Sequence, residues 1–136
     1  MPTTPARYAI ARTLELPFEE ADRRVREALQ SEGFGVLTEI DVRATLKEKL
    51  GVDFPAYEIL GACNPPLAHQ ALLAEPDVGL LLPCNVVVRD AGNGNTVIEA
   101  LDPEIQLEVA DNPRLREMAG EVRARMERVV ERATAM

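Results

Sequence analysis

The sequence lacks several features that would narrow its function at once. Tryptophan is absent, aromatic residues make up 4%, and the 136 residues include one histidine and two cysteines. The longest apolar runs, such as Val78–Pro83, are far too short to span a bilayer, and Met1–Ile10 lacks the apolar core of a signal peptide. We therefore expect a cytoplasmic protein whose two cysteines are free thiols.

Lysine is almost absent, and the 23 acidic residues outnumber the 15 basic ones, so the formal net charge is −8. A surface of this sign repels the phosphates of nucleic acids and of anionic lipids. We therefore expect no nucleic-acid partner and no membrane partner. The composition is otherwise that of a globular protein, with 46% hydrophobic and 28% charged residues. The length fits one domain over residues 1–136.

Familiar catalytic and cofactor motifs are missing as well. The chain has no HExxH zinc motif, no Ser-His-Asp order and no paired-carboxylate signature. Gly92–Gly94 reads as a hairpin turn, because it lacks the lysine and the strand-to-helix context of a phosphate-binding loop. We expect no cofactor, and the pattern favours a protein that is not an enzyme.

Hydrophobic periodicity predicts an α+β fold. Strands are predicted over residues 7–16, 34–40, 56–62, 78–89 and 96–101, and alternation hints at another over 104–110. Helices are predicted to begin at Pro17, Asp41, Asn64 and Asn112, with Gly33 and Gly51 ending the first two. The tight turn between the late strands requires an antiparallel portion. The long last helix carries an apolar stripe and is expected to pack on one sheet face.

Two prolines, Pro83 and Pro103, affect the predicted structure around them. In the segment 78–89 the predicted buried face consists of Leu80, Leu82, Cys84, Val86 and Val88. Pro83 cannot donate a hydrogen bond to a neighbouring strand, so it predicts an edge position or a bulge. Asp102, before Pro103, is interpreted as a turn former.

The stretch around Cys63 is the part of the chain that could carry chemistry. Cys63 precedes Asn64, the expected N-cap of a helix, and a helix N-terminus can lower the pKa of a nearby thiol. The only histidine, His69, lies inside the same helix. A second cysteine-asparagine pair, Cys84 and Asn85, lies on the long predicted strand. These five residues form the candidate thiol or ligand site.

Several interpretations of these residues stay open. Cys63 could be a redox or nucleophilic thiol with His69 or Cys84 as its partner. The same three side chains could hold a metal, although their spacing matches no zinc pattern. The turn at Asn64 could bind an anion through backbone amides, but Pro65–Pro66 removes two donors. Alternatively, both cysteines are small buried apolar residues, which the alternation around Cys84 favours.

Four blocks of the sequence, together with the Asp102-Pro103 pair, resemble one family. The blocks are Gly33–Asp41, Thr45–Gly51, Ile59–Ala68 and Gly79–Val88. They are similar to the family called domain of unknown function 302, over nearly the whole chain. The resemblance implies a TATA-binding-protein-like fold, with a curved antiparallel sheet packed by a long C-terminal helix, and a homodimer. No activity is established for that family, so the resemblance implies no catalytic residue.

The sequence therefore favours a non-enzymatic homodimer that binds a small apolar or amphipathic ligand between sheet and helix, or a protein partner. A thiol-dependent redox protein that uses Cys63 is the alternative, and weak metal binding by the same residues is a third hypothesis. An interior filled by side chains, with no pocket near Cys63 or the sheet face, would exclude the ligand hypothesis.

Overall fold

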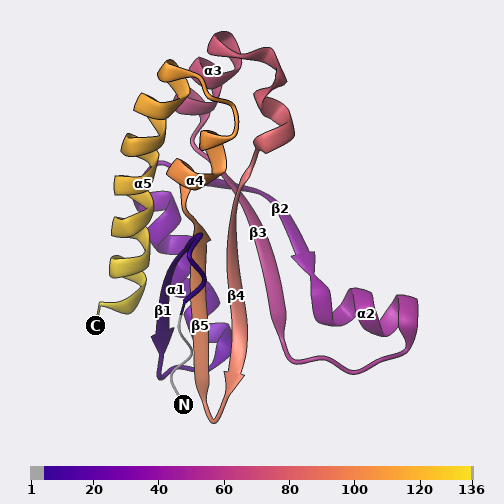
Figure 1. Ribbon diagram of the computed structural model, residues 1–136. Helices are drawn as coiled ribbons and strands as arrows, with labels where there is room; N and C mark the ends of the chain where they lie inside the picture. Colours follow the sequence, from indigo (N-terminus) through magenta and orange to yellow (C-terminus); the bar gives the residue numbers. More distant parts are fainter. Residues whose placement is uncertain (1–4, 136) are drawn as a thin grey trace.

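The five strands form one antiparallel sheet in the order β1-β5-β4-β3-β2 (Figure 1). This computed structural model describes residues 5–135, so part of the Met1–Ile10 segment lies outside the described residues. The strands are β1 (Ala9–Leu14), β2 (Gly35–Asp41), β3 (Tyr57–Cys63), β4 (Cys84–Gly92) and β5 (Asn95–Leu101). The α+β class and the largely antiparallel sheet expected from the sequence are confirmed.

The helices begin and end close to the positions that the capping residues predict. They are α1 (Phe18–Ser31), α2 (Val42–Leu50), α3 (Pro65–Ala74), the 3-10 helix η1 (Pro76–Leu81), α4 (Pro103–Glu108) and α5 (Pro113–Thr134). The Asp41 carboxylate accepts a hydrogen bond from the Ala44 amide at 2.9 Å. Gly51 ends α2 with a φ of 68°, a left-handed conformation that glycine adopts without strain. Pro17 lies at the N-cap of α1, one position earlier than expected.

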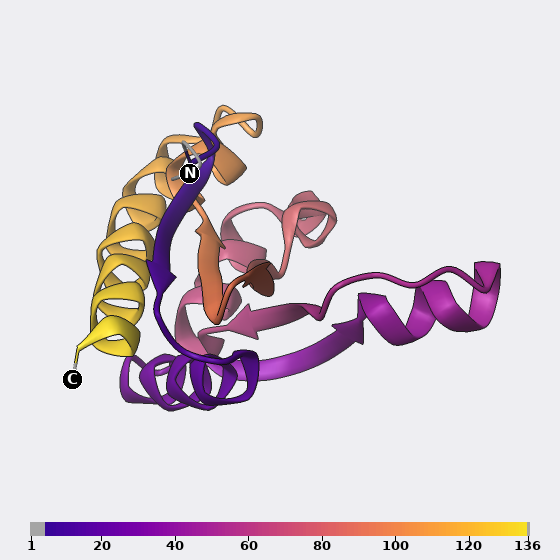
Figure 2. The same ribbon diagram turned by 90° about the horizontal axis from the view of Figure 1, so that it is seen from below.

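The core lies between the sheet and the two long helices. Figure 2 shows the sheet curving, with α1 and α5 on its outer side. Alternate strand residues such as Leu60, Val86 and Ile98 meet Leu29 of α1 and Met126 of α5, and all five are at most 1% exposed. The predicted packing of the last helix on one sheet face is thus confirmed. It is favoured because burial removes most of the apolar stripe of α5 from water.

A smaller core lies at the end of the sheet. It joins α3, η1, α4 and the first half of α5 through Ala71, Val78, Leu107, Leu115 and Ala119. These elements form a cap over the ends of β3 and β4 (Figure 1). Residues of the cap form much of the wall of the candidate site described below.

The strand predicted over 78–89 is wrong in its first half. Residues 76–81 form η1, and β4 begins only at Cys84. β4 pairs with both β3 and β5, so Pro83 precedes an interior strand rather than lying at an edge or within one. Leu80 is 89% exposed, whereas Cys84, Val86 and Val88 are buried as predicted. The reason is that Pro83 has no N–H for a ladder, so pairing starts after it.

The short strand indicated over 104–110 is also wrong, because this segment contains α4. The Asp102 carboxylate accepts from the Glu104 amide at 2.9 Å, and Pro103 occupies the first helical position. Asp102 is therefore an N-cap rather than a simple turn former. The same cap-proline signal was used correctly at Asn64 and Asn112. Here, the alternation of three apolar residues was misleading, since Leu107 is buried and Val109 is 74% exposed.

One part of the chain projects away from this body. We call residues 42–54 the arm; they comprise α2 and the segment that follows it. In Figure 2 the arm extends well beyond α1 and α5. No residue of α2 is buried, although the helix itself was correctly predicted.

Candidate functional site

The end of β3 places Cys63 and Asn64 together under the cap. Cys63 is the last residue of the strand and is half-buried. Asn64 follows it as the N-cap of α3, and its side-chain oxygen accepts from the Leu67 amide at 3.3 Å. The predicted capping role of Asn64 is confirmed, and the asparagine side chain is itself buried.

Cys84 lies on the adjacent strand, with Ala62 as its partner in the β3–β4 pairing. Its thiol donates to the side-chain oxygen of Gln106 at 3.2 Å. Burial raises the pKa of Cys84 to about 11, and the neighbouring Cys63 adds to the increase. Cys84 is therefore a neutral thiol at physiological pH, and a neutral thiol is a poor nucleophile.

Gln106 connects α4 to the segment that leads into β4. Its side-chain amide donates to the Leu81 carbonyl and, at 3.4 Å, to the Pro83 carbonyl. Together with the Cys84 contact, both ends of the Gln106 amide are satisfied by the protein. Gln106 was not predicted as a site residue, because its segment was interpreted as a strand.

A pocket of about 320 Å³ opens beside these residues, and we call it the thiol pocket. Its polar wall contains Thr38, Cys63, Asn64, Cys84 and Gln106. The rest of the wall is apolar and includes Phe34, Leu67, Ala68, Ala71, Leu107 and Met118. The volume lies at the lower end of the range for small-molecule sites, which are mostly apolar with a few placed polar groups. The structure therefore has a pocket near Cys63, which the ligand hypothesis required.

Two of the five predicted site residues lie elsewhere. His69 is exposed on α3 and does not line the thiol pocket. Asn85 is exposed and points to the opposite sheet face from Cys84, because successive strand residues alternate. Within residues 5–135 no group of three or more histidine, cysteine or acidic side chains is arranged to hold a metal ion.

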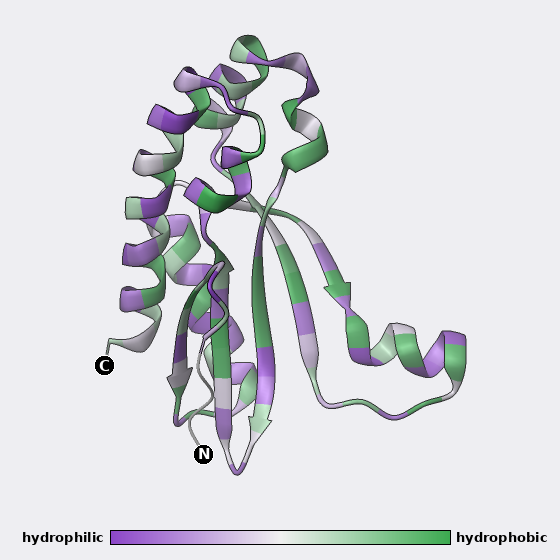
Figure 3. Ribbon diagram, viewed as in Figure 1, coloured by the Kyte–Doolittle hydropathy of each residue, from purple (hydrophilic) through white to green (hydrophobic). Residues whose placement is uncertain are grey.

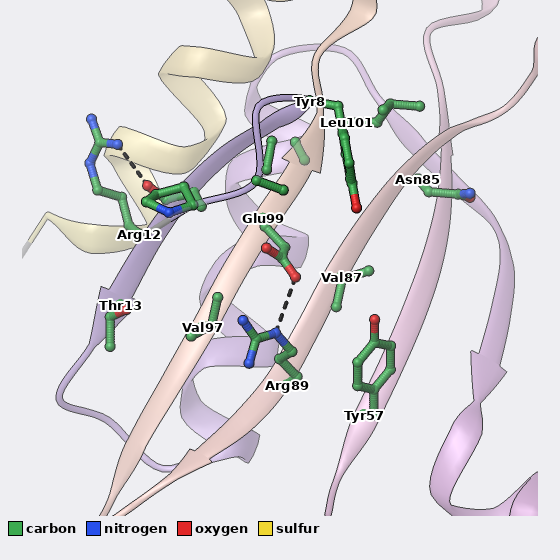
Figure 4. Close-up of a pocket in the computed structure, with 15 residues that line it drawn as sticks. Tyr8, Arg12, Thr13, Tyr57, Asn85, Val87, Arg89, Val97, Glu99 and Leu101 are labelled. Atoms are coloured by element: carbon green, nitrogen blue, oxygen red, sulfur yellow. Dashed lines mark hydrogen bonds and ion pairs between the residues drawn. The ribbon is translucent and has the colours of Figure 1, made fainter. Parts of the chain in front are cut away.

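The open, concave face of the sheet carries a second and larger hollow of about 630 Å³. Tyr8 and Tyr57 reach over this face from opposite sides, with Val87 between them (Figure 4). Arg89 and Glu99 form an ion pair at 3.1 Å across β4 and β5. Arg89 and Glu99 therefore neutralise each other, and Arg12 is the other charged residue in the lining. The strand residues that line this face alternate with the buried core residues, and this alternation is visible in the sequence. No site was predicted from it.

The comparison with protein families gives one match. Residues 10–133 match the family described as Domain of unknown function DUF302. The chain belongs to this family. A crystal structure of an uncharacterized conserved DUF302 protein from Bacillus stearothermophilus is similar to it, with 33% identity, a TM-score of 0.86, and coverage of 94% of this chain and 99% of that one.

The DUF302 match confirms the resemblance seen in the sequence, and it assigns no activity. No curated protein matches the chain. Among residues 5–135, no helix combines the length and the apolar content needed to cross a membrane. The function must therefore be argued from the two hollows and from the surface.

Proposed function

We propose that this DUF302 protein is a non-enzymatic, homodimeric module that binds a small, uncharged and largely apolar molecule in the thiol pocket. One observation carries the proposal: an apolar pocket of about 320 Å³ opens at the end of the sheet. Its polar groups are few, and Cys84 and Gln106 already satisfy each other. A ligand would gain by burying apolar surface, without displacing a strong hydrogen bond.

Charge and location complete the proposal. The net charge of −8 disfavours nucleic acids and anionic lipid surfaces as partners. A cytoplasmic location suits two cysteines that form no disulfide in the structure. The homodimer is supported by the arm, because an exposed apolar element needs a partner.

The experiment uses N-phenyl-1-naphthylamine, a neutral probe whose fluorescence rises in apolar surroundings. Ala68→Phe fills the thiol pocket, whereas the control Ala11→Phe places the same ring on the concave face. We expect the wild type and Ala11→Phe to bind the probe equally, and Ala68→Phe to bind at least tenfold more weakly. No binding by the wild type, or unchanged binding by Ala68→Phe, would overturn the ligand proposal.

A second candidate is a thiol-dependent redox protein that uses Cys63. It is supported by the position of both cysteines on the wall of one pocket and by the effect of Cys63 on the pKa of Cys84. The raised pKa of Cys84 weighs against it, because the thiolate is the reactive form. His69 supplies no base at this pocket. We therefore place this candidate second.

A further inference from the structure

The arm has little support from its own chain beyond the neighbouring strands β2 and β3. Leu50, Val52 and Phe54 are 68%, 44% and 39% exposed, and no α2 residue is buried. A nine-residue helix is too short to be stable in water from its own hydrogen bonds. An arm with this composition therefore needs a surface outside its own chain to cover it.

The charge of the arm differs from that of the rest of the molecule. Both lysines of the chain, Lys47 and Lys49, lie on α2 together with Arg43, against the single carboxylate of Glu48. The helix thus carries a formal charge of +2, and Asp53, which pairs with Lys47 at 3.1 Å, reduces the charge of the whole arm to +1. The total of −8 then leaves −9 on the remainder of the chain. The surface that covers the arm should be apolar and acidic.

The chain itself carries exposed leucines and acidic residues close together in sequence on α3 and η1. Leu72, Leu73 and Leu80 are 43%, 71% and 89% exposed there, beside Glu75 and Asp77. Residues 65–81 contain no arginine or lysine. We call these five residues the α3–η1 patch. Figure 3 shows green, apolar residues on α2 and again on α3 and η1.

The arm cannot reach the patch of its own chain. Strand β3 lies between the arm and the patch in the chain. Its seven residues span about 20 Å at 3.4 Å per residue. In Figure 1 the arm and the patch lie at opposite ends of the β2–β3 hairpin. A two-fold axis beside β2, which is an edge strand, reverses the hairpin direction in the second copy. In such a pair each arm would point toward the other copy's patch, and both contacts would form in one closed dimer.

We propose that the arm of each copy docks on the α3–η1 patch of a second copy of this chain. The apolar side chains of both surfaces are covered together, and the basic helix meets Glu75 and Asp77. This inference rests on the homodimer of the proposed function and adds the surfaces that form it. Leu72 also lines the thiol pocket, so the partner's arm lies beside the ligand site.

The test is a charge swap, followed by sedimentation equilibrium of the full chain. We expect the wild type to sediment at twice the chain mass of 14.9 kDa. Lys49→Glu on the arm and Asp77→Lys on the patch should each weaken dimerisation about tenfold, because each change affects two symmetric contacts. The control Arg7→Glu makes the same change in charge as Lys49→Glu, but outside both surfaces, and should leave the dimer within twofold of the wild type.

Mixing the two variants is the decisive step. In a mixed pair each arm meets a patch of opposite charge, so Lys49→Glu and Asp77→Lys together should recover dimers that neither forms well alone. Leu80→Lys, at the most exposed patch position, is a second variant that should weaken the wild-type dimer. Circular dichroism confirms that each variant is folded.

Each outcome separates this inference from the proposed function. If none of the three substitutions weakens the dimer, or if the mixture forms no more dimer than each variant alone, the proposed docking surfaces are wrong but the homodimer is not excluded. A wild-type chain that stays monomeric at every concentration overturns both the docking and the homodimer. If the charge swap succeeds but the protein does not bind N-phenyl-1-naphthylamine, only the ligand proposal is rejected.

Discussion

The thiol of Cys84 donates to the side-chain oxygen of Gln106 at 3.2 Å, and this contact links β4 to α4 across 22 positions of sequence. The Gln106 amide also holds the carbonyls of Leu81 and Pro83. One glutamine therefore fixes the segment that precedes β4 and forms one wall of the thiol pocket. Replacing Gln106 should therefore lower the stability of the fold more than it weakens ligand binding.

We expect Gln106→Ala to lower the free energy of unfolding by about 2 kcal/mol, because it leaves half-buried carbonyls and the Cys84 thiol without their partner. Urea unfolding followed by circular dichroism measures the change. The matched control is Gln70→Ala, on the exposed side of α3, which should change stability by less than about 0.5 kcal/mol. Equal effects of the two substitutions would show that the Gln106 contacts contribute nothing to stability.

The two cysteines should differ sharply in reactivity. With its pKa raised to about 11 by burial and by Cys63, Cys84 should resist alkylation in the folded protein at pH 8. Iodoacetamide followed by peptide mass spectrometry should therefore label Cys63 alone, and both cysteines after unfolding in urea. In Cys63→Ala, labelling of folded Cys84 should begin at a lower pH, because the neighbouring charge is gone. Rapid labelling of Cys84 at pH 8 would favour the redox candidate over the proposed ligand binding.

Glu58 should make stability depend on pH around neutrality. Burial, and next the neighbouring Asp22, raise the pKa of Glu58 to about 7, although Arg26 lies 2.7 Å away. The folded state thus binds the proton more tightly than the unfolded state. Its contribution to stability is complete below pH 4.5 and is lost as the pH rises through 7.

The size of this effect is limited because Glu58 keeps some contact with solvent. We expect it to remove about 1 kcal/mol of unfolding free energy between pH 5 and pH 8. Glu58→Gln should flatten that slope, whereas Glu48→Gln on the exposed arm should not. Urea unfolding at several pH values provides the measurement, and parallel slopes for Glu58→Gln and the wild type would contradict the assignment.

Gly61 should tolerate no side chain. A Cβ atom there would overlap the Thr38 hydroxyl and lie 2.9 Å from Cγ of Pro83. We expect Gly61→Ala to cost about 2 kcal/mol, because β2 or the Pro83 segment must move away from β3. The control Gly35→Ala, with nothing within 4 Å of its added Cβ, should cost less than about 1 kcal/mol in thermal or urea unfolding. Similar stabilities of the two variants would mean that the close approach at Gly61 relaxes freely.

Much of the fold was predictable because it depends on short stretches of sequence. The N-caps Asp41, Asn64 and Asn112 each lie beside the helix they begin, and Gly51 ends its own helix. The two errors, in the first half of 78–89 and at 104–110, arose where local alternation competed with a proline. Pro83 lacks the donor that a ladder needs, and Pro103 after the Asp102 cap begins a helix, so the proline was the better guide in both segments.

Most of the order of elements, the apolar stripe of α5 and the position of Cys63 beside a helix start could be predicted, because each depends on neighbours a few residues apart. Long-range packing alone places Cys63 in a pocket with Cys84 and Gln106, keeps His69 and Asn85 outside it, and leaves α2 without a buried residue. These relationships depend on the packing of segments that are distant in the chain, and no local pattern of residues records which distant surfaces will meet.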